Sequence, residues 1–143
     1  THPFLHGMRD DHLAVLALAA AEVTVPAGQR LFEDGGYAGR FWLIESGRVA
    51  LDLNIPGEGP VVLEHVGMGE LLGWSWLFPP YEWAFGAVAV TTVWAFEFDA
   101  AEVRARFTSD PVFGRDLTGR VARVLAHRLQ ATRVRLLREC QAR

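Results

Sequence analysis

The chain has 143 residues, half of them hydrophobic, and a formal net charge of −3. That length fits one domain whose core is large enough to fold without disulfides or metals. No apolar run reaches the roughly 18–20 residues of a membrane-spanning helix, and the first residues lack the basic and apolar regions of a secretory signal. The composition therefore predicts a single globular domain.

The positive charge is concentrated near the end of the chain. Residues 1–103 contain four arginines and 14 acidic residues, whereas residues 104–143 contain ten arginines and three acidic residues. The chain has no lysine, and no arginine occurs between Arg48 and Arg104. An anionic ligand bound by the middle of the chain would therefore find no arginine or lysine there.

In chain order, residues 8–22 have apolar side chains at helical spacing and predict a first helix. Short strand-like runs bounded by turn residues follow at residues 30–32, 40–44, 48–53, 60–66 and 87–98. Residues 41–44 and 49–53 are expected to pair as a hairpin around Gly47, which suits a turn position with positive φ. Many short strands at this spacing predict a mostly-β fold, an antiparallel roll or jelly-roll-like barrel.

A long helix is predicted from Pro111 to about Cys140, since Ser109 or Asp110 can cap it and proline suits its first position. About 30 residues at 1.5 Å each span about 45 Å, which is too long to be covered by one small roll. Its apolar stripe consists of Val121, Val124, Leu125, Leu129, Thr132 and Leu136. A helix with such a stripe usually pairs with another helix, so we predict a homodimer.

The strand region resembles the cyclic nucleotide-binding domain family, including the sensor domain of the catabolite-activator type of regulator. The residues that carry the resemblance are Gly28, Leu31, Phe32, Gly35, Ala38, residues 41–44 and Gly47. The family's fold implies a roll with an N-terminal helix over residues 1–108 and a dimerisation helix over residues 109–143. We expect no DNA-binding domain after this helix, and therefore a stand-alone, non-enzymatic regulatory module. Nucleic acid is an unlikely partner, because the arginines of the helix are spread around it and lack the aromatic interleaving of single-strand binders.

The resemblance extends to the family's phosphate-binding cassette, which here comprises Gly69, Glu70, Leu71, Leu72, Gly73, Trp74 and Ser75. By resemblance, Glu70 would hold the ribose 2′-hydroxyl, Gly73 would allow close backbone approach, and Ser75 could donate a hydrogen bond. The arginine that closes the cassette in the family is absent from residues 79–89, and Glu82 stands near its expected position. An arginine such as Arg128 or Arg135 could instead come from a partner's long helix.

Loss of one charge-assisted hydrogen bond costs roughly 1.5–3 kcal/mol, so we expect cyclic-nucleotide binding to be weak or lost and no resident cofactor. Two alternatives stay open. The first is a true cyclic AMP or cyclic GMP sensor that uses backbone groups and an unconventional arginine. The second is a ligand-free, dimeric protein–protein interaction module.

Residues 74–85 hold six of the chain's 16 aromatic residues. Trp74, Trp76, Trp83 and Phe85 either line an apolar ligand pocket or fill the emptied nucleotide site as additional core. We favour the second interpretation.

The remaining reactive side chains form no recognisable catalytic or metal pattern. His2, His6, His12, His65 and His127 lack thiol or carboxylate partners at metal-ligand spacing. No Ser-His-Asp or paired-carboxylate arrangement is evident, and Cys140 is the only cysteine. We expect no metal site, no enzyme, no membrane contact and, by default, a cytoplasmic location.

Overall fold

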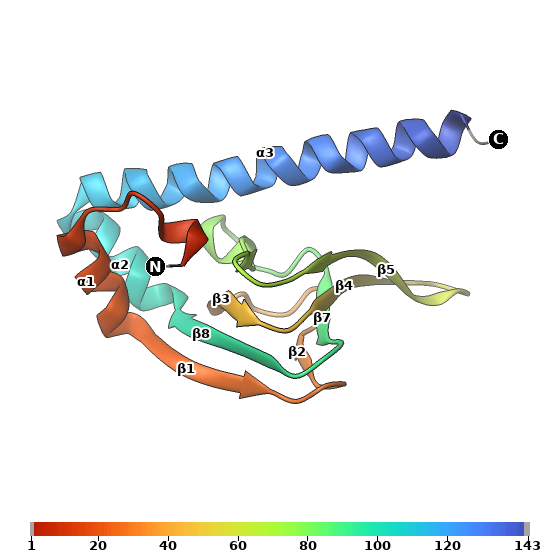
Figure 1. The fold of residues 1–143 in the computed structure, drawn as a ribbon, viewed down its shortest axis with the longest axis horizontal. Helices are drawn as coiled ribbons and strands as arrows, with labels where there is room; N and C mark the ends of the chain where they lie inside the picture. Colours follow the sequence, from red (N-terminus) through yellow and green to blue (C-terminus); the bar gives the residue numbers. More distant parts are fainter. Residues whose placement is uncertain (1, 142–143) are drawn as a thin grey trace.

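The chain folds into two four-stranded antiparallel sheets, with two shorter α-helices at one end and a long C-terminal helix that starts there and runs beside the sheets (Figure 1). A computed structural model describes residues 2–141. One sheet has the order β1-β8-β3-β6, formed by β1 (Ala20–Val25), β8 (Val93–Asp99), β3 (Arg40–Ser46) and β6 (Leu71–Leu72). The other has the order β2-β7-β4-β5, formed by β2 (Arg30–Phe32), β7 (Gly86–Ala89), β4 (Val49–Ile55) and β5 (Gly59–Val66).

Three α-helices accompany these sheets: α1 (Asp10–Ala19), α2 (Ala100–Ser109) and α3 (Pro111–Gln141). Two short 3-10 helices, η1 (Pro3–Leu5) and η2 (Ser75–Leu77), complete the secondary structure of residues 2–141. The predicted mostly-β class with an N-terminal and a long C-terminal helix is confirmed. Within the described part of the chain the strands form two separate sheets and not a closed barrel.

The N-terminal helix is shorter than predicted. It ends at Ala19, and residues 20–25 form β1, in which Ala20 is paired with Phe98 and Val25 with Val93 of β8. The prediction of a helix to Glu22 is therefore wrong. Val23, Thr24 and Val25 favour a strand, and pairing with β8 outweighs the helical propensity of the preceding alanines.

The predicted hairpin around Gly47 is also wrong, because β3 and β4 lie in different sheets. The turn between them carries the chain from one sheet to the other. Gly47 has φ +96°, and a Cβ there would collide with the carbonyl oxygen of Thr92, so only glycine fits. The adjacent paired hairpin is instead β4–β5, in which Val49 is opposite Val66.

The single strand expected over residues 87–98 is two strands in different sheets. β7 pairs with β2 and β4, whereas β8 pairs with β1 and β3. Between them the chain turns next to Arg48, whose carbonyl oxygen accepts a hydrogen bond from the Val90 amide at 2.8 Å. The sequence analysis also missed α2, which Asp99 caps by accepting a hydrogen bond from the Glu102 amide.

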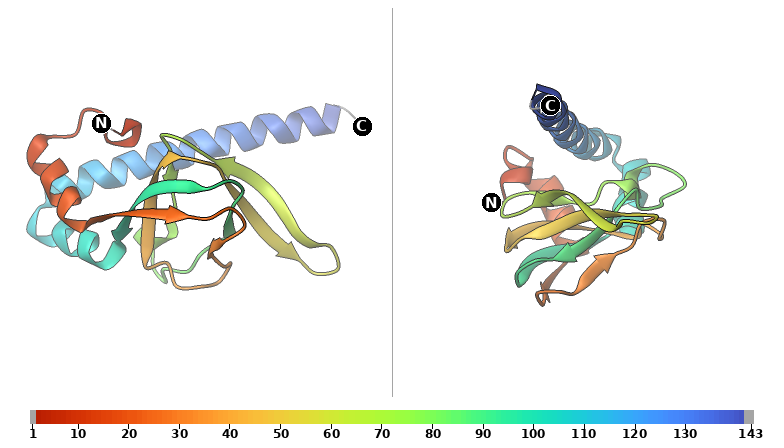
Figure 2. Two further views of the ribbon diagram at one scale, coloured as in Figure 1. Left: turned by 60° about the horizontal axis from the view of Figure 1, so that its bottom comes forward. Right: turned by 90° about the vertical axis from the view of Figure 1, so that its right-hand side faces the viewer.

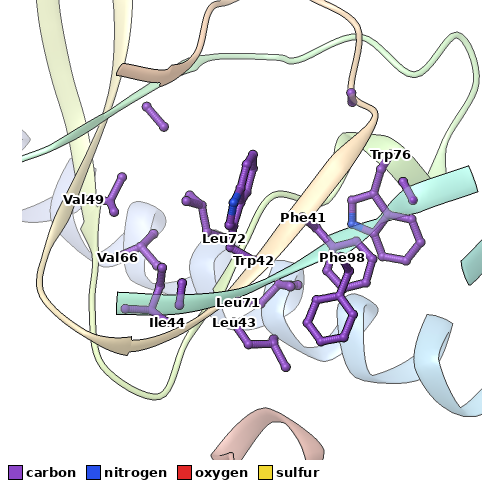
Figure 3. Close-up of a cluster of buried hydrophobic side chains, with 14 of the residues drawn as sticks. Phe41, Trp42, Leu43, Ile44, Val49, Val66, Leu71, Leu72, Trp76 and Phe98 are labelled. Atoms are coloured by element: carbon purple, nitrogen blue, oxygen red, sulfur yellow. The ribbon is translucent and has the colours of Figure 1, made fainter. Parts of the chain in front are cut away.

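The strand β3 is buried on both faces. Phe41, Trp42, Leu43 and Ile44 are each at most 5% exposed. The Phe41 ring stacks between Trp76 and Phe98 at centroid distances of 4.2 and 4.8 Å (Figure 3). This two-sided burial fixes β3 in the centre of the molecule and holds the neighbouring strand β6 against it.

The helix α3 begins at Pro111, as predicted, and runs along the whole length of the roll (Figures 1 and 2). Val121 is fully buried against the chain's own core, and Val124 and Leu125 pack partly against it. Leu129 and Leu136 are 62% and 55% exposed, and Thr132 is half-buried.

The predicted dimerisation stripe is therefore divided along the helix. Its first half packs on the chain's own roll, because the N-terminal turns of α3 lie over the core, and its exposed apolar side chains, Leu129 and Leu136, lie on the second half. Among residues 2–141, no helix combines the length and the apolar character that crossing a membrane requires.

Candidate functional site

The cassette residues 69–75 lie along β6 and lead into η2. In β6, Leu71 is paired with Leu43 of β3 and Leu72 with Trp42. Both leucine side chains are buried, and the Gly69 amide donates to the Ile44 carbonyl oxygen at 2.9 Å. The core thus fixes the backbone of the cassette on the edge of the first sheet.

Glu70 has an exposed side chain that is already engaged by its own loop. Its Oε1 accepts a hydrogen bond from the Gly67 amide at 2.9 Å. This bond closes the turn before β6 and uses one of the several acceptor positions of the carboxylate.

The space beside Gly73 is filled by Trp83. Gly73 has φ +95°, and a Cβ there would lie 2.9 Å from the Trp83 ring. Trp83 is 4% exposed and stacks on Phe32 with a centroid distance of 3.8 Å. The Trp83 indole therefore packs against the Cβ side of Gly73, and a larger residue at this position would collide with it.

The other predicted aromatics divide into two groups. Trp76 is fully buried, and its Nε1 donates to the Gly73 carbonyl oxygen at 3.0 Å. Ser75, beside it, is 4% exposed. Trp74 and Phe85 are only half-buried, and their rings meet edge to face at 6.1 Å. The core interpretation therefore fits Trp76 and Trp83, whereas Trp74 and Phe85 face an open cavity.

Glu82 is exposed, and its backbone forms an isolated bridge with Tyr37. It is not among the residues that line the cavity beside the cassette. Residues 49–103 contain no arginine or lysine, so neither the cassette nor the segment that follows it to the end of β7 carries the family's cation.

The cation at the cassette comes from α3 of the same chain. The Arg128 Nη2 donates to the Leu71 carbonyl oxygen at 2.6 Å, and its Nε lies 3.6 Å from Glu64 Oε1. Burial lowers the pKa of Arg128, and the nearby carboxylates of Glu64 and Glu70 partly oppose that shift. The sequence analysis considered such an arginine from a partner's helix; in this chain Arg128 of its own α3 reaches the cassette, because the first half of α3 packs on the roll.

Arg135 lies one heptad further along α3, where its Nη1 donates to the Leu63 carbonyl oxygen of β5 at 2.8 Å. The sequence analysis considered Arg135 only as an arginine from a partner's long helix. The spacing of seven residues between Arg128 and Arg135 was the signal that could have placed both on one helix face.

Arg104, on α2, was not considered in the sequence analysis. Its Nη1 donates to the Trp76 carbonyl oxygen at 2.7 Å, and its guanidinium lies over the Tyr81 ring at 4.1 Å. This arginine ties α2 to the segment after the cassette, and no motif in the sequence pointed to that contact.

A cavity of about 280 Å³ lies between the roll and α3. Its apolar lining comes from Leu51, Leu63, Trp74, Phe85, Leu125 and Leu129, and its polar lining from Glu64, Arg128, Thr132 and Arg135. A larger cavity, of about 750 Å³, lies under the N-terminal segment and α1, and Gly69 is the only predicted ligand-binding residue on it.

Comparison with known proteins identifies the family to which this fold belongs. The family model for the cyclic nucleotide-binding domain matches residues 22–110. Over 126 residues the chain is 26% identical to the CRP-like cAMP-activated global transcriptional regulator of Mycobacterium tuberculosis. The matched region covers 88% of this chain and 54% of that protein. The chain thus spans about half the length of this curated relative.

Two solved structures agree with this assignment. The N-terminal domain of a transcriptional regulator from Streptomyces coelicolor is 27% identical, with a TM-score of 0.71 over 90% of this chain and 92% of that one. The catabolite activator protein of Thermus thermophilus is 25% identical, with a TM-score of 0.73 over 94% of this chain and 61% of that one. The chain belongs to the cyclic nucleotide-binding domain family.

Proposed function

We propose that the chain is a non-enzymatic regulatory domain in which cyclic-nucleotide binding is weak or lost. The observation that carries this proposal is the Trp83 ring, which is buried on Phe32 and lies against Gly73 of the cassette. On the Cβ side of Gly73, a nucleotide could come close only if this indole moved out of the core. Moving a buried tryptophan sacrifices packing worth several kcal/mol, roughly what truncating one costs.

Electrostatics support the same conclusion. A cyclic phosphate binds most strongly to a bidentate guanidinium, and residues 49–103 offer none. Among the described residues, the arginine that contacts the cassette is Arg128, whose Nη2 donates to the Leu71 carbonyl oxygen and whose Nε lies 3.6 Å from Glu64 Oε1. Only its Nη1 is unpaired, so the guanidinium cannot hold a phosphate through two nitrogens without giving up one of these contacts. Glu70 is held by the Gly67 amide.

The proposal is tested by titrating the protein with cyclic AMP and with cyclic GMP in a calorimeter. We expect no heat of binding at high micromolar ligand, and no rise in melting temperature at a concentration where a 10 μM site would be saturated. At a hundredfold excess over its Kd, a ligand stabilises the folded state by about 2.7 kcal/mol, which a melting curve resolves easily. A Kd in the low micromolar range would contradict the proposal.

The variant Glu82→Arg distinguishes the effect of the missing cation on nucleotide binding from the effect of the space that Trp83 fills. Because Trp83 still fills the space beside Gly73, the added guanidinium alone should not restore nucleotide binding. A large gain in this variant would show that the site is open and lacks only its cation.

A second candidate is a cyclic-nucleotide sensor that uses Arg128, and one observation favours it. The Arg128 guanidinium already contacts the cassette backbone at Leu71, so a guanidinium lies close to the place where the family binds phosphate. If this candidate is right, the wild type binds cyclic AMP and Arg128→Gln abolishes that binding. If no small ligand binds at all, the domain is a ligand-free protein–protein interaction module.

We further propose that the domain is a homodimer in the cytoplasm. Leu129 and Leu136 leave apolar surface exposed on the outer half of α3, and pairing of two such helices would cover it.

A further inference from the structure

The cavity between the roll and α3 differs in character from a nucleotide site. Six of its ten lining residues are apolar, and Thr132 is the only uncharged polar residue among them. Its volume of about 280 Å³ is at the lower end of the range for small-molecule sites. These properties favour a compact ligand with an apolar body, not one with several sugar hydroxyls.

The charged residues of the lining carry an excess positive charge. Arg128 and Arg135 line the cavity together with one carboxylate, that of Glu64. Glu64 lies on the Nε side of Arg128, at 3.6 Å. The Arg128 Nη1, by contrast, is buried and has no hydrogen-bond partner among the described residues. Buried donors are rarely left unpaired, because the missing bond costs free energy.

Desolvation lowers the pKa of Arg128, as expected for a guanidinium whose counter-charges are incomplete. Glu70, the other carboxylate that acts on it, is exposed and bonded to the Gly67 amide. An acceptor oxygen bound in the cavity would supply both the missing hydrogen bond and the missing negative charge after a small rotation of the guanidinium.

We propose that this cavity binds a small organic monoanion, a carboxylate on an aromatic or aliphatic body, with Arg128 and Arg135 as its counter-ions. The proposal rests on the proposed function, since it names the class of ligand that a regulatory domain without nucleotide binding would bind. The body packs against Trp74, Phe85 and Leu125, and the carboxylate faces α3. Because the two walls of the cavity belong to the roll and to α3, the bound anion joins them.

The test uses 1-naphthylacetate and its uncharged counterpart of nearly the same shape, 1-naphthylacetamide, in calorimetric titrations of the wild-type chain. We expect the acid to bind at least tenfold more tightly than the amide, because a charge-assisted hydrogen bond is worth about one to two powers of ten in affinity. The dianion 1-naphthyl phosphate should bind more weakly than the acid, since Glu64 repels its second charge.

The variants Arg128→Gln and Arg133→Gln form a matched pair on the same helix. Arg133 is exposed and bonds only to Gln130 among the described residues. Arg128→Gln should weaken binding of the acid at least tenfold, and Arg133→Gln should leave it unchanged. Circular dichroism checks that both variants fold. The comparison of acid and amide in the wild type stands even if Arg128→Gln does not fold.

Equal affinity for acid and amide, no binding of the acid at low millimolar concentration, or equal effects of the two variants would overturn the proposal. Tighter binding of the phosphate would overturn the assignment to carboxylates. Tight cyclic AMP binding that 1-naphthylacetate competes with would overturn the proposed function as well. If neither the acid nor cyclic AMP binds, the carboxylate proposal is overturned and the proposed function is not.

Discussion

Replacing Trp83 by alanine removes the ring that fills the space beside Gly73. Trp83 is 4% exposed and stacks on Phe32 at 3.8 Å, with Trp42 at 6.2 Å. Truncation of a fully packed aromatic costs about 3–5 kcal/mol, since the transfer free energy of the ring is lost and a cavity remains. For a small domain, that is a large part of the total free energy of unfolding.

Urea denaturation followed by circular dichroism measures this loss through the change in midpoint at constant slope. The matched control is Trp94→Ala, because Trp94 is 55% exposed on β8. Its replacement should change the free energy of unfolding by no more than about 0.5 kcal/mol. The difference between the two variants then reports burial and not the loss of a tryptophan as such.

A loss below about 1 kcal/mol for Trp83→Ala would refute this reasoning, because it would mean that the ring is not part of the core. The indole would then be free to leave the site, and the steric argument against nucleotide binding would fail with it.

Two further predictions concern the cassette turn and the long helix. Gly73→Ala and Gly57→Ala both place a side chain at positive φ, which costs roughly 1–2 kcal/mol, but only the alanine at position 73 meets the Trp83 ring. Urea denaturation should therefore show a further loss of about 1–3 kcal/mol in the free energy of unfolding for Gly73→Ala. Equal losses for the two variants would contradict the contact. Light scattering of the wild type should give about twice the 15.9 kDa chain mass. The double variant Leu129→Asp, Leu136→Asp should be a folded monomer. A wild-type monomer at high protein concentration would contradict the dimer.

Local signals in the sequence located most strands and the start of α3 correctly. Proline at position 111 and the glycines between strands are read from a few neighbouring residues, so these boundaries need no tertiary information. The pairing of β1 with β8 and the separation of β3 from β4 depend on partners far away in the sequence. Neither feature could be derived from periodicity. The predictions of a helix to Glu22 and of a hairpin around Gly47 failed for this reason.

The candidate site divides in the same way. The cassette residues and the absence of a cation among them are visible in the sequence. The origin of the arginine is not, because it depends on how α3 packs over its own roll. Arg128 was named as a candidate, but its contact with Leu71 of the same chain follows only from the tertiary arrangement.

The most direct measurement for the central claim is a crystal structure of the protein grown with millimolar cyclic AMP. The account predicts an unoccupied cassette, with the Trp83 ring stacked on Phe32 against Gly73 and the Arg128 guanidinium bonded to the Leu71 carbonyl oxygen. Nucleotide density beside Glu70, with Trp83 displaced from Gly73, would contradict it.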